Sequence, residues 1–282
     1  MEEVYREIFS LMKSALKEDI RDGDVTSEAC IVENEMISAE FVCKQEGRIA
    51  GLPFLETLFS MVDSKISVIL LREEGDDLSV GEVFAKIRGP VKAILRAERV
   101  ALNFLQHCSG IASMTKRYVD KVQGCCEILD TRKTLPGLRA LAKYSVKVGG
   151  GSNHRYCLSD RFLIKNNHLS FISKKESRPI FEAVKRARRY RSNLKVEVEV
   201  ENMEMVKEAL DSGADIIMLD NMSVSSVKEA VSKIQKRAYV EASGGISLET
   251  VYDYAVTGVD GISIGKLTHS AGAIDISLRF VS

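Results

Sequence analysis

The second half of the chain alternates short apolar runs with amphipathic helical patterns, and this alternation limits the possible fold more than any other feature. The apolar runs predict strands at 127–130, 162–164, 195–201, 215–219, 238–242 and 260–265. The helical patterns between them lie at 136–146, 179–190, 203–212, 223–236 and 247–257. Because strands that alternate with helices form parallel sheets, the pattern predicts an α/β fold with about six parallel strands, either an open sheet or a barrel.

The first half of the chain has a different pattern. From about residue 36 to 90, strand-like runs surround one helix that begins at Pro53, which indicates an α+β region. A long helix is expected from Val91 to Val122, with a break at Ser109 and Gly110. The first twenty residues have apolar residues close to helical spacing and predict an amphipathic helix rather than a signal peptide.

These two patterns predict two domains. We expect an N-terminal α+β domain at residues 1–108 and, at residues 109–269, a catalytic domain that is an open, parallel α/β barrel of about six strands. The C-terminal tail, residues 270–282, is expected to pack back on the first domain.

Charge and cysteine content exclude several classes of protein. The 40 Lys and Arg residues balance 40 Asp and Glu residues, so no net charge attracts nucleic acid or an anionic membrane, and any cationic site must be local. No run approaches the roughly 18 apolar residues of a membrane span. The six cysteines have no C-x-x-C pair and no metal-ligand spacing with the four histidines, which predicts reduced thiols and a cytoplasmic location.

Reactive polar residues follow almost every predicted strand. They are Asp130 to Lys133, Lys165 to His168, Glu199 and Glu201, Asp220 and Asn221, Ser243 to Gly245, and Gly265 and Lys266. Because α/β barrels build their active sites from this rim, we expect one site assembled from six loops. The alternative for Asn221 to Ser223 and for Ser247 is that these residues cap the following helices.

The run KVEVEVE places acids inside a predicted strand. Side chains alternate along a strand, so Glu197, Glu199 and Glu201 share one face and the valines share the other. Parallel sheets are usually covered on both faces, and an unpaired buried carboxylate is unstable. At least one glutamate is therefore expected to meet a cation or a metal, unless the strand is an exposed edge.

Two glycine stretches are candidate phosphate sites. ASGGIS lies between a strand and a helix, and GISIGK follows the last strand, where barrels often bind phosphate. The alternative is a pair of tight turns. GISIGK is not a P-loop, because Leu267 follows Lys266, and VGGGSNHR does not match the dinucleotide pattern. With the carboxylates and a dense group of Arg, Lys and His, the site suits a sugar phosphate, a polycarboxylate and Mg²⁺.

The ordered motifs of the chain resemble those of one family. They are EDIRDGDVTS, AERVALNFLQHCSGIAS, DTRKTLPGLR, GGGSNHR, FLIKNNH, VEVEV, IIMLDN, EASGGI and GVDGISIGKLTHS. In this order and spacing they resemble nicotinate-nucleotide pyrophosphorylase (carboxylating), also called quinolinate phosphoribosyltransferase. The commoner family forms are IKDNH and ESSGGI, so the sequence departs from them at Asn166 and Ala242.

The resemblance implies a pentosyltransferase that converts quinolinate and phosphoribosyl pyrophosphate to nicotinate mononucleotide, pyrophosphate and carbon dioxide in NAD biosynthesis, with Mg²⁺. It implies that quinolinate is held by Arg99, Arg132, His154, Arg155 and Lys165. It assigns the phosphates to Lys133, Arg139, Ser243, Gly244, Gly245 and Gly265, and the metal to Glu199 and Asp220. Catalytic roles are implied for Lys133, Lys165, Glu199 and Asp220.

The resemblance also implies a homodimer in which Arg99 enters the partner's site. Two alternatives stay open at this point. One is a paralogous group associated with molybdate transport, which usually lacks the lysine that stands here at Lys165. The other is a non-catalytic protein of the same fold that binds small anions.

Overall fold

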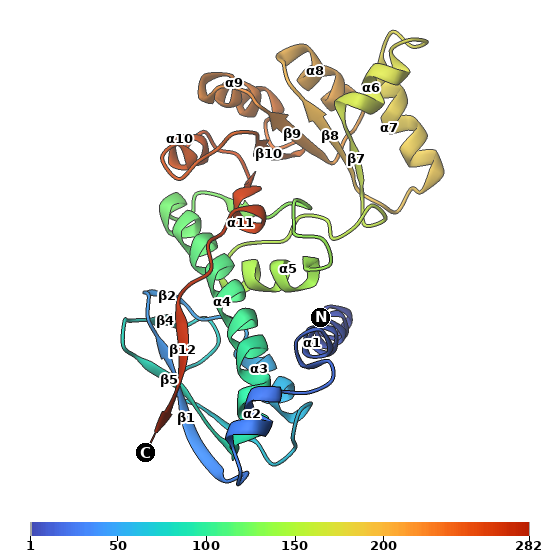
Figure 1. Ribbon diagram of the computed structural model, residues 1–282. Coiled ribbons are helices and arrows are strands. Elements are labelled where there is room, and N and C mark those ends of the chain that lie inside the picture. The colour runs from blue at the N-terminus through green and yellow to red at the C-terminus, as the bar shows by residue number, and fades with distance from the viewer. Residues whose placement is uncertain (1, 282) are drawn as a thin grey trace. The chain divides into compact units, whose positions relative to one another are not determined.

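The computed structural model describes residues 2–281 and divides into two compact units (Figure 1). Of the described residues, the sheet unit contains 2–116, 134–150 and 266–281, and the barrel unit contains 117–133 and 151–265. The chain therefore leaves the sheet unit, returns to it once between two strands of the barrel unit, and returns again at its end. The predicted boundary at residues 108 and 109 stays a prediction.

The sheet unit contains a four-stranded antiparallel sheet in the order β12-β1-β5-β3. These strands are β1 (Met36–Cys43), β3 (Ser67–Leu70), β5 (Val83–Pro90) and β12 (Ile276–Val281). A two-stranded ribbon is formed by β2 (Gly47–Arg48) and β4 (Asp77–Leu78). The helices are α1 (Glu2–Ile20), α2 (Val25–Cys30), α3 (Leu52–Ser60), most of α4 (Val91–Val122), α5 (Arg139–Val148) and α11 (Lys266–His269).

An aromatic cluster forms the core of this unit. The side chains of Phe41, Phe59 and Phe84 are fully buried. The ring centroid of Phe41 lies 6.1 Å from that of Phe59 and 5.9 Å from that of Phe84. β12 pairs antiparallel with β1 from Ser38 opposite Val281 to Cys43 opposite Ile276, so the end of the chain completes the sheet. The N-terminal amphipathic helix is confirmed as α1, which buries Ile8, Met12 and Leu16.

The predicted break at Ser109 and Gly110 is wrong, because α4 runs uninterrupted over 32 residues. Both residues are used for packing within the sheet unit. The Ser109 hydroxyl accepts a hydrogen bond from the backbone N–H of Ala50 at 2.9 Å. A Cβ atom at residue 110 would lie 2.2 Å from the carbonyl oxygen of Gly272, so the glycine allows a close backbone approach. Tertiary contacts override the low helix propensity of Ser and Gly.

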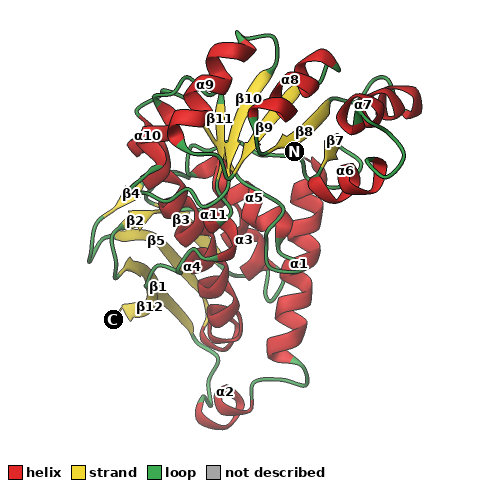
Figure 2. Cartoon of the chain, turned by 90° about the horizontal axis from the view of Figure 1, so that it is seen from above, coloured by secondary structure: helices red, strands yellow, loops and turns green. Residues whose placement is uncertain are grey.

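The barrel unit contains a six-stranded parallel sheet in the order β6-β11-β10-β9-β8-β7, which confirms the predicted open α/β barrel (Figure 2). The strands are β6 (Glu127–Leu129), β7 (Phe162–Ile164), β8 (Val196–Val200), β9 (Ile216–Asp220), β10 (Tyr239–Ser243) and β11 (Gly261–Ser263). The helices are α6 (Asn166–Ile172), α7 (Pro179–Tyr190), α8 (Met203–Asp211), α9 (Val224–Ile234) and α10 (Val251–Ala255).

The starts of α9 and α10 show whether the strand-end residues before them cap these helices. The Ser223 side chain accepts a hydrogen bond from the backbone N–H of Ser226 and caps α9, so the capping alternative is correct there. Ser247 does not cap a helix, because α10 begins at Val251 with Thr250 as its N-cap residue. Asn221 has a left-handed backbone conformation with φ of 55° and lies before the cap of α9.

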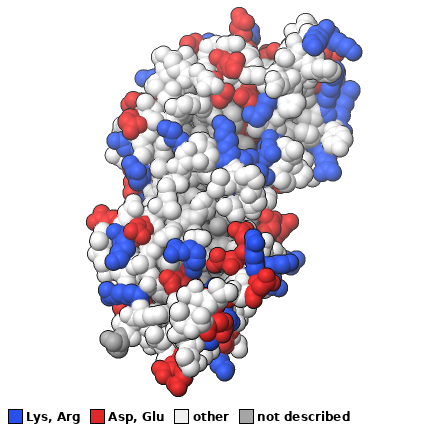
Figure 3. Space-filling model, in the orientation of Figure 1, with Lys and Arg blue, Asp and Glu red and all other residues white. Residues whose placement is uncertain are grey.

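Surface charge agrees with the balanced composition. Figure 3 shows Lys and Arg interspersed with Asp and Glu on the visible face. No helix within residues 2–281 combines the length and the apolar composition that a membrane crossing requires.

Candidate active site

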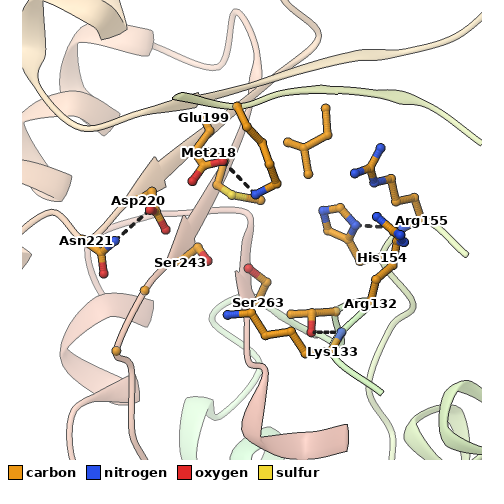
Figure 4. Close-up of a pocket in the computed structure, with 15 residues that line it drawn as sticks. Arg132, Lys133, His154, Arg155, Glu199, Met218, Asp220, Asn221, Ser243 and Ser263 are labelled. Atoms are coloured by element: carbon orange, nitrogen blue, oxygen red, sulfur yellow. Dashed lines mark hydrogen bonds and ion pairs between the residues drawn. The ribbon is translucent and has the colours of Figure 1, made fainter. Parts of the chain in front are cut away.

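A pocket of about 500 Å³ lies in the barrel unit, at the carboxyl ends of the parallel strands (Figure 4). Its walls come from the loops or final residues of all six strands, as the rim of polar residues predicted. The lining residues are Thr131, Arg132, Lys133, His154, Arg155, Leu163, Lys165, Glu199, Met218, Asp220, Asn221, Ser243, Gly244, Gly245 and Ser263.

One side of the pocket is cationic. Arg132 and Lys133 follow β6, Arg155 lies in the loop before β7, and Lys165 follows β7. Burial lowers the pKa of Arg155, and the charge of Arg132 lowers it further, so these two guanidinium groups repel each other. The Nε atom of Arg132 is buried and has no hydrogen-bond partner among the described residues. An anion between these groups would relieve the repulsion and supply the missing acceptor.

The opposite side carries carboxylates. The Nζ atom of Lys165 donates to Oε2 of Glu199 at 2.8 Å, and Asn221 donates through its side-chain amide to Asp220 at 2.7 Å. Burial raises the pKa of Asp220, and the neighbouring charge of Glu199 raises it further. Two carboxylates this close are stabilised by a cation between them. The prediction that a glutamate of the KVEVEVE run meets a cation is confirmed at Glu199.

The third part of the pocket is bare backbone after β10. Gly244 and Gly245 have φ values of +95° and +64°, and Ser243 ends the strand just before them. A Cβ atom at residue 244 would lie 2.3 Å from the side-chain oxygen of Asn221 and 2.7 Å from its backbone nitrogen. The Asn221 N–H also donates to the carbonyl of Ser243 at 2.9 Å. The loops after β9 and β10 are thus held together, and residue 244 must be glycine.

A buried group of charged residues lies beneath the cationic side. Nε2 of His154 lies 3.2 Å from Oε1 of Glu197 and 3.6 Å from Oε1 of Glu241. The Nε atom of Arg161 lies 3.1 Å from Oε2 of Glu197. The backbone N–H of His154 donates to the buried carboxylate of Asp130 at 2.8 Å. These contacts fix the His154 loop against β6, β8 and β10.

The structure brings together most of the residues predicted for the site, with three exceptions. Gly265, which follows β11, does not line the pocket. Arg99 on α4 and Arg139 at the start of α5 belong to the sheet unit, and their roles in the site stay predictions.

Glu241 and Arg161 were not predicted. Glu241 is an acid inside an apolar strand, the same pattern that singled out Glu197 and could have identified it. No local pattern distinguishes Arg161 from a surface arginine.

The fold and the pocket together define an open α/β barrel with a pocket of Arg, Lys, Glu and Asp side chains at the carboxyl ends of its strands. The chain belongs to the quinolinate phosphoribosyltransferase family. Residues 24–109 match the family model described as quinolinate phosphoribosyl transferase, N-terminal domain, and residues 111–279 match the model of its C-terminal domain.

Individual relatives match over almost the whole chain. A Bacillus subtilis protein named as a probable carboxylating nicotinate-nucleotide pyrophosphorylase is 43% identical over 272 residues, which cover 95% of this chain and 91% of the relative. The carboxylating nicotinate-nucleotide pyrophosphorylase of Mycobacterium leprae is 39% identical, and the match covers 95% of each chain. The solved structure of the nicotinate-nucleotide pyrophosphorylase from Francisella tularensis superposes with a TM-score of 0.91 at 36% identity, covering 98% of this chain and 96% of that one.

Proposed function

We propose that the protein is a carboxylating nicotinate-nucleotide diphosphorylase, a pentosyltransferase of NAD biosynthesis. It transfers the phosphoribosyl group of phosphoribosyl pyrophosphate to quinolinate and releases nicotinate mononucleotide, pyrophosphate and carbon dioxide. The observation that carries this proposal is a pocket in which Arg132 and Arg155 stand opposite Glu199 and Asp220, with Lys165 between them, in a chain of this family. The relatives' names give no support to a molybdate-associated or purely anion-binding role.

The cationic side of the pocket is the proposed site of quinolinate. Its two carboxylates match the guanidinium groups of Arg132 and Arg155, because arginine binds a carboxylate through two parallel hydrogen bonds. Lys165 supplies a further charge and is already paired with Glu199, so it stands between the quinolinate side and the ribose side. His154 lies at the floor of the same side.

The carboxylate side is the proposed site of the ribose. When pyrophosphate departs, the ribose ring acquires positive charge, and Glu199 and Asp220 stabilise it through charges that are already in position. Their oxygen donors also fit Mg²⁺, which binds carboxylate oxygens. Bound Mg²⁺ would neutralise charge on the departing pyrophosphate. Ser243, Gly244 and Gly245 would hold the 5′-phosphate through backbone N–H groups.

Decarboxylation needs little from the protein. Once its nitrogen carries the ribose, the pyridine ring is cationic and stabilises the carbanion that remains when the carboxylate beside the nitrogen leaves as carbon dioxide. A proton from solvent then binds that ring carbon and completes nicotinate mononucleotide. The contribution of the pocket is to hold the two reactants in line and to keep the carboxylate charges balanced until that step.

Further site roles and the assembly rest on the family resemblance. Lys133 and Arg139 would bind phosphates, with Gly265 near the 5′-phosphate. The protein would act as a homodimer in which Arg99 enters the partner's site. A cytoplasmic location is supported by its six cysteines, all of which are unpaired thiols.

Product analysis tests the proposed function. The protein is incubated with quinolinate, phosphoribosyl pyrophosphate and Mg²⁺, and the products are identified by mass spectrometry. We expect nicotinate mononucleotide and carbon dioxide in equal amounts, and loss of both when a chelator removes the metal. A nucleotide that retains both carboxylates, or no nucleotide at all, would refute the proposal.

A further inference from the structure

Two acids of the buried group under the pocket, Glu197 and Glu241, have no role in the proposed reaction. His154, Glu197 and Glu241 come from one loop and two strands, and their side chains are 5%, 0% and 0% exposed. The only one of the three that lines the pocket is His154, which Figure 4 shows beside Arg155. Two acids are thus placed directly behind the cations that would receive an anionic substrate.

Hydrogen bonding fixes the tautomer of His154. The backbone N–H of Arg155 donates to Nδ1 of His154 at 2.8 Å, so Nδ1 carries no proton. The imidazole proton is therefore on Nε2, where it faces Glu197 and Glu241. In this geometry His154 is neutral. Its Nδ1 atom accepts a backbone hydrogen bond, and the proton on Nε2 faces the two carboxylates.

The same tautomer argues against a metal ion at this place. His154, Glu197 and Glu241 each offer a ligand atom, and these atoms lie within 4.8 Å of one another. A metal-bound histidine normally donates its other ring N–H to an acceptor. Here Nδ1 accepts instead, so the position facing the two acids is occupied by a proton.

Arg161 contacts one of the two carboxylates, that of Glu197. Arg161 balances Glu197 at 3.1 Å, whereas neither oxygen of Glu241 has a hydrogen-bond partner among the described residues. Five neighbouring groups of Glu241 are Glu197 on β8, Ser263 on β11, Asp130 after β6, and Arg161 and His154 from the loop before β7. A sixth is Tyr239 on β10 itself, whose hydroxyl donates to Glu127. The Ser263 hydroxyl faces Glu241 without the geometry of a regular hydrogen bond.

An ionised Glu241 would therefore be a buried charge without a counterion, which is strongly disfavoured. Burial raises the pKa of Glu241 to about 8, and the charge of Glu197 acts in the same direction. These surroundings favour the protonated carboxyl group of Glu241. It fills the space beside Nε2 of His154 without adding a negative charge.

We propose that Glu241 is a positioning residue for the substrate acid: its side chain packs beside Nε2 of His154, and its own proton keeps a further negative charge away from Arg132, Arg155 and Lys165. This inference rests on the proposed function for the identity of the acid, quinolinate. Ionisation of Glu241 would place a negative charge behind these cations and weaken their attraction for a dianion.

Binding of quinolinate at different pH values tests the proposal. Dissociation constants are measured by calorimetry between about pH 7 and about pH 9.5 for the wild type, for Glu241→Gln and for Glu229→Gln, an exposed glutamate on α9. In the wild type we expect binding to weaken about tenfold across this range, because one unscreened charge is added near the ligand. Glu229→Gln should follow the wild type, and Glu241→Gln, which cannot ionise, should change by less than about twofold.

A second measurement needs neither substrate nor variant stability. Infrared spectra of the free wild-type protein with isotope-labelled glutamate should contain a protonated carboxyl band that disappears above about pH 8. The same band should be absent from Glu241→Gln if that variant folds. No such band, or one equivalent of Zn²⁺ retained by the wild type and lost from Glu241→Gln, would overturn the assignment.

The two proposals fail in different ways. If the wild type binds no quinolinate at any pH, the proposed function is contradicted, and the infrared band still decides whether Glu241 keeps its proton. If the wild type binds and converts quinolinate but its affinity is constant across the range, Glu241 has no influence on the substrate acid and the inference is refuted.

Discussion

Lys165 is the residue that joins the two sides of the pocket. It follows the edge strand β7, its side chain is 48% exposed, and its ammonium group is paired with Glu199 at 2.8 Å. A half-exposed ion pair of this kind contributes little to stability, so the position of Lys165 is better explained by ligand binding.

Replacing Lys165 therefore separates binding from folding. Lys165→Ala is expected to reduce kcat/KM for quinolinate by at least about tenfold, which corresponds to about 1.4 kcal/mol of lost transition-state stabilisation. Its thermal unfolding temperature should remain near that of the wild type. Lys207→Ala, on the exposed face of α8, is the matched control and should leave both quantities unchanged. A kcat/KM within about threefold of the wild type would show that Lys165 is a surface lysine without a role in the reaction.

Glu199 and Asp220 are expected to act on the ribose rather than on quinolinate. Glu199→Ala and Asp220→Ala should lower kcat more than they raise the KM for quinolinate, because charge develops on the ribose in the transition state and not in the bound reactants. Steady-state kinetics with quinolinate varied at saturating phosphoribosyl pyrophosphate measure both parameters. An unchanged kcat with a raised KM in both variants would assign these carboxylates to ground-state binding.

The turn after β10 has two consecutive glycines, which are required for different reasons. Gly244 is fixed by packing, since any side chain would meet the backbone of Asn221, whereas Gly245 has nothing within 4 Å of its Cβ position. Both residues adopt φ values that favour glycine. Gly245 is therefore open to a ligand and Gly244 is closed by the neighbouring loop.

This difference predicts two separate defects. Gly244→Ala should lower the free energy of unfolding by more than the roughly 1–2 kcal/mol of left-handed strain alone, because a backbone clash is added. Gly245→Ala should show only the strain, while raising the KM for phosphoribosyl pyrophosphate, since its methyl group would occupy the phosphate space. Denaturant unfolding and kinetics on both variants are the measurements. Equal stability losses, or an unaffected KM in Gly245→Ala, would contradict the phosphate role of this turn.

The helices and strands show how much of the fold the sequence could predict. Alternating apolar runs and helical patterns identified all six barrel strands and the residues at their ends, because strand-end polarity is a local property. The break predicted in α4 was wrong, since the use of Gly110 depends on a contact with Gly272, 162 residues further along the chain. Arg161 and its ion pair with Glu197 were missed for the same reason. Contacts between distant segments decide such positions, and no short pattern records them.

One predicted site residue, Arg99, depends on how whole molecules assemble. Arg99 lies on α4, the helix that passes from the sheet unit into the barrel unit. The family resemblance implies that this arginine serves the site of a partner subunit. Twofold symmetry would then give each dimer two sites, each built from residues of both chains.

A mixing experiment tests the shared site. Arg99→Ala and Lys165→Ala should each be nearly inactive alone. After unfolding and reassembly together, half of the dimers should be mixed, each with one intact site, and about a quarter of wild-type activity should return. If Arg99 acts within its own chain, no mixed site is intact. Absence of recovery, with mixed dimers demonstrated by differential tags, would refute the shared site and leave the proposed reaction unaffected.

The choice between a diacid and a monoacid tests the central claim most directly, because the cations of the pocket are its main feature. The measurement is kcat/KM for quinolinate, nicotinate and nicotinamide, each offered separately with phosphoribosyl pyrophosphate and Mg²⁺. Only quinolinate should react at a significant rate, since a monoacid leaves one of the two partly buried guanidinium groups, Arg132 or Arg155, without a carboxylate partner. Turnover of nicotinate comparable to that of quinolinate would contradict the account.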